Sequence, residues 1–425
     1  MNYFSRLSAA AMVAVLAGSQ PLSAQSPKKN AVIQIPATVL SIQGSVKRMI
    51  SYRDQNHAWQ SSDNAIHLVV NLGSTPAGNG LALYSSFDNG NTWTQMFTLP
   101  QTDGASTDDG VLTPTATGAT LQLVYNTSPN IGTIVYATAN YDSSSNTWSA
   151  PITQTAFASP GIVASNPAFA ADDVGNLWCA FTEENSAALQ YQEELIYQAA
   201  GTQQWVDSGL ILGTVDNTTQ HSARPVPYTG GVGVIYEDEN TLYWAYRQDS
   251  FAFTDPWVTT PVYVGLPPES SDPYDSHFSV VADSSNNLYL AFVSAPANLS
   301  FTAFTSSTNT WLAPETLASS TSSPAYPQVS IETDTETGAA TLMLLANYET
   351  SVKVMQATTF SPSAKPPFIT TQILTHTPAQ SGSGISYGKP RVEAPRYSNS
   401  PMPVFQQFVN GTTEELMFFS VPVLN

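Results

Sequence analysis

Short apolar runs recur along the chain at nearly even spacing, and each follows a cluster of Gly, Asn, Asp or Ser. The last residues of these runs are separated by 55, 56, 55, 56, 53 and 63 positions. Self-similarity at a fixed period of this length indicates a repeat architecture. The seven runs are 66–70, 121–125, 177–181, 232–236, 288–292, 342–345 and 404–408.

A second series of residues keeps the same period, half a repeat later. It consists of Trp93, Trp148, Trp205, Trp257 and Trp311, spaced by 55, 57, 52 and 54 positions. Each Trp follows a segment in which apolar and polar residues alternate, which is typical of a β-strand. Each repeat is therefore predicted to be a meander of about four short strands. Such units bury their faces when they stack around an axis, which gives a β-propeller.

The seven apolar runs predict an all-β fold, a seven-bladed β-propeller of four-stranded antiparallel blades. The last repeat is short of one strand, because only 415–419 follows its apolar run. The missing outer strand is expected from the N-terminal region of about 31–45, from 31–35 or 38–42, which would close the ring. Residues 25–425 then form one propeller domain. The longer last spacing leaves a six-bladed alternative open.

The first 24 residues read as a secretory signal peptide. Arg6 precedes an apolar run at 9–17, and small residues end at Ala24, where cleavage is expected. The mature chain is predicted to be secreted or periplasmic. No other stretch approaches the about 18 apolar residues of a membrane span. With 32 acidic and 13 basic residues the net charge is −19, which disfavours nucleic acid as a partner. We expect a monomer that binds a carbohydrate or polysaccharide.

One hairpin carries a known motif. Ser86, Asp88, Gly90 and Trp93 match the Asp-box pattern S-x-D-x-G-x-x-W. The chain thus resembles the sialidase-like, Asp-box (BNR-repeat) propeller superfamily. In that superfamily the box is a structural turn on the face away from the ligand, so the resemblance implies a fold and no particular reaction. The nearest approach to the Arg-Ile-Pro element of sialidases is Arg48-Met49-Ile50, so a true sialidase is not expected.

Propeller ligands bind where the loops that enter the innermost strands meet. If the apolar runs are second strands, these entrances lie about fifteen residues earlier, an offset that two short strands and a turn explain. This register brings a set of polar residues to one opening, with His57 close to the first-blade position. Ligand-binding roles are expected for Asp109, Asn166, Lys389 and Arg391, and catalytic roles for His221, His277, Tyr326 and Arg224.

Three functions remain open for this opening. In a polysaccharide lyase, Arg224 would neutralise a uronate carboxylate, His221 or His277 would abstract the neighbouring proton, and Tyr326 would protonate the leaving oxygen. The arrangement resembles secreted seven-bladed ulvan lyases. A glycoside hydrolase needs two opposed carboxylates instead. The carboxylates available to this hydrolase are Glu183 or Glu184, opposed by Asp238 or Asp275. The third function is that of a non-catalytic lectin or protein-binding scaffold.

No cofactor or metal is expected, with a structural cation as the alternative left open. Asp172-Asp173 and Asp334-Thr335-Glu336 resemble cation ligands, but both fall in predicted turns and lack the full spacing of a Ca²⁺ loop. The aromatic residues Trp59, Tyr387 and Tyr397 are candidates for stacking on sugar rings. The sequence therefore predicts an exported, sialidase-like propeller that recognises a glycan. If the protein is an enzyme, it is expected to cleave that glycan.

Overall fold

The computed structural model describes most of the chain after residue 36. The predicted signal peptide, His221, His277, Asp275, 334–336 and Tyr397 lie outside the described residues. The described residues are 37–43, 49–50, 55–75, 78–127, 132–185, 187–188, 190–216, 222–228, 230–266, 278–294, 298–319, 325–333, 339–348, 351–375, 385–392, 402–410, 413–421 and 423.

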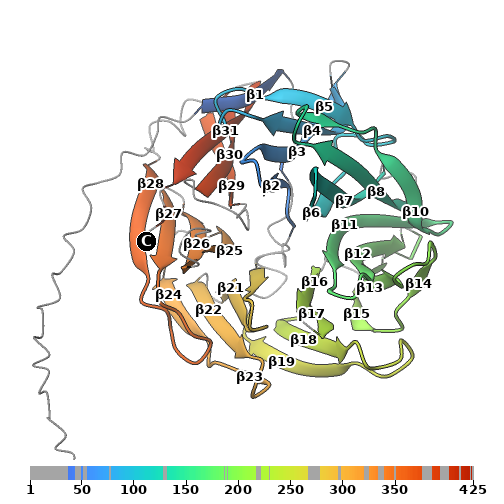
Figure 1. The fold of residues 1–425 in the computed structure, drawn as a ribbon. Coiled ribbons are helices and arrows are strands. Elements are labelled where there is room, and N and C mark those ends of the chain that lie inside the picture. Colours follow the sequence, from blue (N-terminus) through green and yellow to red (C-terminus); the bar gives the residue numbers. More distant parts are fainter. Residues whose placement is uncertain are drawn as a thin grey trace, which may run out of the picture. The chain divides into compact units, whose positions relative to one another are not determined.

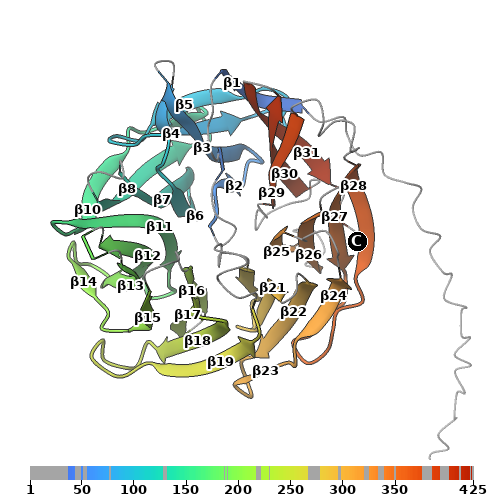
Figure 2. The ribbon, with the colours of Figure 1, turned by 180° about the vertical axis from the view of Figure 1, so that it is seen from behind.

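Seven antiparallel sheets follow one another around an axis (Figure 1). The prediction of a seven-bladed propeller is confirmed, and the six-bladed alternative is wrong. Each apolar run lies in the second strand of its sheet, also as predicted. The view from behind shows the first strands, such as β2, β6, β16 and β25, nearest to the axis (Figure 2).

The first three blades contain the strands from Ala58 to Asp216. Blade 1 consists of β2 (Ala58–Gln60), β3 (Ile66–Thr75), β4 (Gly78–Ser86) and β5 (Thr94–Thr98). Blade 2 consists of β6 (Asp108–Thr115), β7 (Gly118–Asn126), β8 (Thr133–Asp142), β9 (Thr147–Trp148) and β10 (Ile152–Ala158). Blade 3 consists of β11 (Ile162–Ala171), β12 (Leu177–Asn185), β13 (Gln190–Gln198), β14 (Trp205–Asp207) and β15 (Leu212–Asp216).

The other four blades complete the ring. Blade 4 consists of β16 (Ala223–Tyr228), β17 (Gly231–Asp238), β18 (Thr241–Gln248) and β19 (Val258–Val264). Blade 5 consists of β20 (Phe278–Ala282), β21 (Leu288–Ser294), β22 (Asn298–Thr305), β23 (Thr310–Trp311) and β24 (Glu315–Ser319). Blade 6 consists of β25 (Ala325–Thr333), β26 (Ala340–Tyr348), β27 (Ser351–Ala357) and β28 (Ile369–Thr375). Blade 7 consists of β1 (Ala37–Gln43), β29 (Ile385–Val392), β30 (Met402–Asn410) and β31 (Thr413–Val421).

The second strands read as continuous apolar runs because both of their faces are covered. All seven residues of β21 are buried, for example. A strand covered on one face only would alternate apolar and polar residues. The outer strands do show exposed positions, as in β10, where no residue is fully buried. The blades therefore pack face to face, and the apolar runs recur along the chain because each blade buries its second strand in this way.

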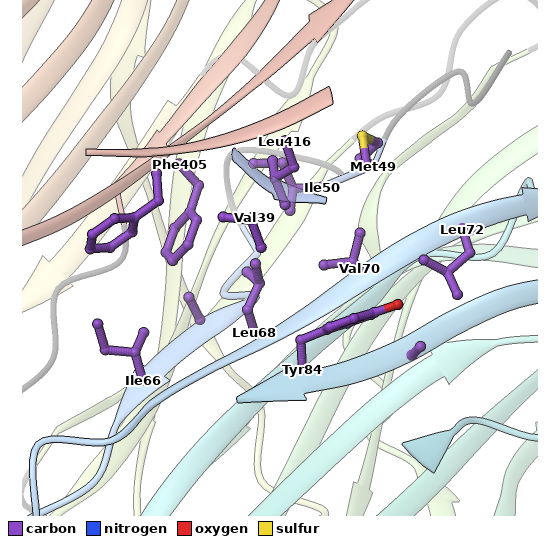
Figure 3. Close-up of a cluster of buried hydrophobic side chains, with 13 residues drawn as sticks. Val39, Met49, Ile50, Ile66, Leu68, Val70, Leu72, Tyr84, Phe405 and Leu416 are labelled. Atoms are coloured by element: carbon purple, nitrogen blue, oxygen red, sulfur yellow. The ribbon is translucent and has the colours of Figure 1, made fainter. Parts of the chain in front are cut away.

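The last sheet combines strands from both ends of the described chain. β1 pairs antiparallel with β31, so that Ser41 lies opposite Glu415. Of the two segments expected for this strand, 38–42 lies in β1, whereas 31–35 lies outside the described residues. Val39 of β1 joins a buried cluster with side chains of blades 1 and 7, among them Leu68 and Phe405 (Figure 3).

The turn between β4 and β5 of blade 1, which carries the residues that match the Asp-box pattern, packs against blade 7. Ser86 Oγ accepts a hydrogen bond from Gly90 N–H at 2.8 Å and donates one to Asp88 Oδ1 at 2.9 Å. Gly90 has a φ of +85°, and a Cβ there would lie 2.3 Å from Cε1 of Phe418. The Trp93 ring lies 6.0 Å from that of Phe418. The box residues thus form a structural turn, and only glycine fits its crowded position.

None of the described segments is a helix long and apolar enough to cross a membrane.

Candidate functional site

The inner strands of several blades begin at the same end of the ring, which we call the mouth. Asp108 and Asp109 open β6, and Ala223 and Arg224 open β16. Arg224 lies on a different blade from Asp109, yet its Nη1 atom lies 2.6 Å from Asp109 Oδ2. Two of the residues expected at the mouth are thus in direct contact there.

Asp109 accepts hydrogen bonds from four different segments. Its Oδ1 atom accepts from the N–H of Asn56 at 2.6 Å and from its own neighbour Gly110 at 2.9 Å. Its Oδ2 atom accepts from the N–H of Phe169 at 2.5 Å, in addition to Arg224. We call Asn56, Asp109, Phe169 and Arg224 the Asp109 hub. The hub joins the inner-strand regions of blades 1 to 4.

Burial dominates the electrostatics of the hub. Asp109 is fully buried, and burial raises the pKa of its carboxyl to about 6, against the opposing effects of the Arg224 guanidinium and the backbone donors. Arg224 is only 9% exposed. Because the guanidinium already has a carboxylate partner, a carboxylate of a ligand would have to share it or displace Asp109.

Cys179 is buried close enough to the Asp109 hub for the charge of Asp109 to act on its thiol. Burial raises the pKa of its thiol well above the usual range, and the charge of Asp109 raises it further. A thiol that stays protonated is a poor nucleophile. Cys179 is therefore a buried, unreactive side chain inside blade 3.

The segment before β2 adds a second contact near the hub. His57 Nδ1 lies 3.2 Å from Asp108 Oδ2, and the His57 side chain is fully buried. Gln55 Nε2 donates to the carbonyl oxygen of Pro167 at 2.7 Å. These contacts hold blade 1 against blades 2 and 3. Since His57 is enclosed, it serves packing in this state and does not reach a ligand.

Trp59 is not the sugar-stacking platform that its position suggested. Its ring is 9% exposed and packs between blades 1 and 2 among Leu83 and Leu121. Its Nε1–H donates to the carbonyl oxygen of Gly110 at 3.2 Å. An aromatic ring enclosed on both faces contributes to stability and cannot stack on a ligand.

The remaining predicted lyase residues are placed only in part. Tyr326 lies in β25, and Lys389 and Arg391 lie in β29, but their side chains are outside the described residues. Asn166 lies in β11 at a β-bulge and has a φ of +52°, so it bends the entrance of its inner strand. The structure therefore places Asp109 and Arg224 in contact. The ligand-binding and catalytic roles of the other residues stay predictions.

The predicted carboxylates lie at the ends of second strands. Glu183 and Glu184 lie directly before Asn185, the last residue of β12, and Asp238 is the last residue of β17. Glu183 interacts with Glu194 on the neighbouring β13, a residue that the sequence did not single out. Burial, together with the charges of Glu183 and Asp207, raises the pKa of Glu194 to about 7. These carboxyls share one sheet, so Glu183 faces a carboxyl within its own blade.

Acidic turn residues stabilise their own hairpins. Asp172 Oδ1 accepts from the N–H of Asn176 at 2.7 Å, and Oδ2 accepts from Nε1 of Trp178 at 2.9 Å. Within the described ranges, no group of three or more His, Cys, Asp or Glu side chains is arranged to hold a metal ion.

The comparison with solved structures supports the fold, whereas the two comparisons of sequence find no match. No protein-family model and no curated protein matches this sequence, so membership of the Asp-box superfamily stays a prediction. Among solved structures, the chain is similar to a PL25 ulvan lyase bound to -[GlcA(1-4)Rha3S]-, with 8% identity, a TM-score of 0.54 and coverage of 91% of this chain and 96% of the lyase.

Two further structures are similar. The polysaccharide lyase Uly1 has 11% identity, a TM-score of 0.50 and coverage of 91% of this chain and 99% of Uly1. The Aleuria aurantia lectin AAL, in complex with Fucalpha1-6GlcNAc, has 12% identity, a TM-score of 0.44 and coverage of 78% and 99%. The resemblance to these carbohydrate-active propellers is structural and distant.

Proposed function

We propose that this protein binds a polysaccharide at the mouth. The observation that carries the proposal is the convergence of polar groups from blades 1 to 4 on Asp109 and Arg224. Ligand sites need a few polar groups held in place by a rigid scaffold. The hub supplies this rigidity, because each of its hydrogen bonds joins a different blade to the same carboxylate. Long glycan chains suit a ring whose polar positions recur around one opening.

The charges described at the mouth favour a neutral polysaccharide as the ligand. Asp108 and Asp109 lie beside Arg224 and His57, so the described residues carry no excess of positive charge there. The whole chain has a net charge of −19. A polyanion would be repelled at long range, and this repulsion weakens as salt is added. Binding of a neutral polysaccharide should instead depend little on salt.

A polysaccharide lyase is the second candidate. It is favoured by the two similar structures with TM-scores of 0.50 and 0.54, both of which are polysaccharide lyases. In this reaction a base removes the proton next to the uronate carboxylate, and the glycosidic C–O bond breaks as a C=C bond forms. His221 or His277 would be the base, Tyr326 the acid, and Arg224 the partner of the carboxylate. The carboxylate would have to share Arg224 with Asp109.

One pair of assays separates the two candidates. Purified protein is incubated with a panel of uronate-containing and neutral polysaccharides. Affinity electrophoresis measures binding, and ultraviolet absorbance measures the unsaturated product of elimination. Retardation without absorbance supports a binding protein, whereas absorbance that rises with time supports a lyase. If no polysaccharide of the panel retards the protein or is cleaved, the proposed function is wrong.

Substitutions then test the place of binding. His221→Ala and His277→Ala should weaken binding at least tenfold if the mouth holds the glycan, and in a lyase they should abolish turnover. Lys365→Gln is the control, because Lys365 pairs with Glu315 at 3.4 Å on an exposed part of the surface. This control removes a charge without touching the mouth and should leave binding unchanged. Equal loss in all three variants would contradict the assignment to the mouth.

A further inference from the structure

A cavity of about 690 Å³ opens between two turns of blade 2. One turn joins β6 to β7 and contributes Ala116 and Thr117, and the other follows β8 and contributes residues from Asn140 to Ser149. Asp109 stands at the opposite end of β6. Ala116 follows Asp109 by seven residues, which corresponds to about 23 Å of strand. The cavity is therefore separate from the mouth, and we call it the blade 2 turn pocket.

Trp148 provides the aromatic wall of this pocket, and blade 1 holds it in place. The ring of Trp148 is half-buried, and its Nε1–H donates to Ser85 Oγ at 3.2 Å. His67 meets this ring edge-on at 4.9 Å, and Tyr141 lies against it at 5.2 Å. The Tyr141 hydroxyl donates to Asp63 Oδ2 at 2.7 Å. The wall is thus preorganised by part-buried hydrogen bonds and ring contacts, so a ligand need not order it.

The remaining lining groups are hydroxyls, an amide and one carboxylate. The hydroxyls come from Thr117, Ser144 and Thr147, among others, and the amide from Asn140. The exposed carboxylate of Asp142 accepts from the N–H and hydroxyl of Ser144 at 2.9 and 2.7 Å. The ten lining residues include no Lys or Arg, so nothing in the pocket offsets the charge of an anionic ligand.

These groups match the chemistry of a sugar ring. The C–H face of a pyranose packs on an aromatic side chain, and its hydroxyls exchange hydrogen bonds with amide, hydroxyl and carboxylate groups. Small-molecule pockets of about 300–1,000 Å³ combine such an apolar wall with a few polar groups. A sulfated or uronate sugar would meet Asp142 without a cation to offset the repulsion. We propose that the blade 2 turn pocket binds a neutral pyranoside and gives the protein a second glycan contact away from the mouth.

Blade 5 offers a matched control for this pocket. Its hairpin repeats the local geometry, since Thr308 and Thr310 hydroxyls lie 2.7 Å apart, as do those of Ser145 and Thr147. Both Thr147 and Thr310 are exposed and stand directly before a half-buried Trp. In blade 5 that residue, Trp311, packs against Phe304 at 5.2 Å. The variants Thr147→Tyr and Thr310→Tyr should fold equally well, but only the new side chain at position 147 would fill the blade 2 turn pocket.

Saturation-transfer NMR tests the proposal on the full chain. The probes are methyl glycosides of glucose, galactose, mannose, rhamnose and N-acetylglucosamine, with methyl glucuronide as the anionic comparison. We expect saturation transfer to at least one neutral glycoside and, in the double variant His221→Ala/His277→Ala with an altered mouth, none to the glucuronide. Thr147→Tyr should reduce the signal at least fivefold, and Thr310→Tyr should leave it unchanged. The double variant His221→Ala/His277→Ala should also retain it, which separates this pocket from the mouth.

Three results would overturn the proposal. The first is an absence of transfer to every neutral glycoside. The second is a signal that Thr147→Tyr and Thr310→Tyr reduce equally, because the binding would then not depend on this pocket. The third is a signal that vanishes in the histidine double variant, since that would assign the neutral sugar to the mouth. Thermal unfolding of both Tyr variants confirms that they fold like the parent protein.

Discussion

Two buried polar networks join blades 1 to 4, and they differ in the charge of their central groups. The Asp109 hub lies at the mouth and keeps a carboxylate beside the Arg224 guanidinium. The second network lies between blades 1 and 2 and centres on His67, whose ring nitrogens lie 3.0 Å from Ser61 Oγ and 2.8 Å from Ser85 Oγ. The first network pairs two charges. The second surrounds a neutral ring with hydroxyls and aromatic side chains.

The comparison shows that burial alone sets the direction of each pKa. Burial raises the pKa of Asp109 to about 6 and lowers the pKa of His67 to about 3, because it disfavours the charged form of both groups. Nearby charges oppose burial in each case, Arg224 at the hub and Asp63 beside His67. The two networks should therefore respond to acid with opposite signs.

The largest expected effect follows from breaking the charge pair. Arg224→Ala leaves the Asp109 carboxylate buried without its cation, and removal of one partner of a buried pair costs about 3–5 kcal/mol. Urea unfolding monitored by circular dichroism measures the loss. The loss should be smaller at pH 5 than at pH 8, because protonated Asp109 no longer needs the cation.

A double-mutant cycle checks the cause. Asp109→Asn combined with Arg224→Ala should lose clearly less stability than the sum of the two single variants. Additive losses would mean that the two side chains stabilise the ring independently, contrary to the geometry of the hub.

The sequence predicted the hub better than it predicted the His67 network. The fifteen-residue offset placed Asp109 at an inner-strand entrance because every blade repeats the same strand order. The partners of His67 come from two blades: Ser61 and Ser85 of blade 1 contact its ring nitrogens, and Tyr141 of blade 2 packs against its ring. No period along the chain relates these positions. Glu194 was missed for a similar reason, since only the pairing of β12 with β13 brings it to Glu183.

The second prediction uses pH to separate the networks. Between pH 6.5 and about 3 the unfolded chain protonates His67 and the folded chain does not, so this group loses stability as the pH falls. Between pH 3.8 and about 6 the folded chain protonates Asp109 first, so this group loses stability as the pH rises. The His67 contribution amounts to about 3 kcal/mol between pH 7 and pH 4.

His67→Gln isolates that contribution. On going from pH 7 to pH 4, the variant should lose about 3 kcal/mol less stability in urea unfolding than the parent protein. As an independent check, the ring C–H resonances of His67 in ¹³C-histidine-labelled parent protein should not titrate above pH 4. A midpoint near 6.5 would show that His67 is accessible to solvent and that the two networks do not differ as described.

The smallest effect concerns a hydroxyl that links the two parts of the second network. Ser85 Oγ contacts His67 Nδ1 at 2.8 Å and accepts from Trp148 Nε1 at 3.2 Å. Ser85→Ala removes both contacts in a fully buried position, which should cost about 1.5 kcal/mol. Ser149→Ala, at an exposed hydroxyl of blade 2, should cost less than about 0.5 kcal/mol. Trp148 fluorescence should also change in the first variant only. If both serines cost the same, the network would be a surface feature without the rigidity that the blade 2 turn pocket requires.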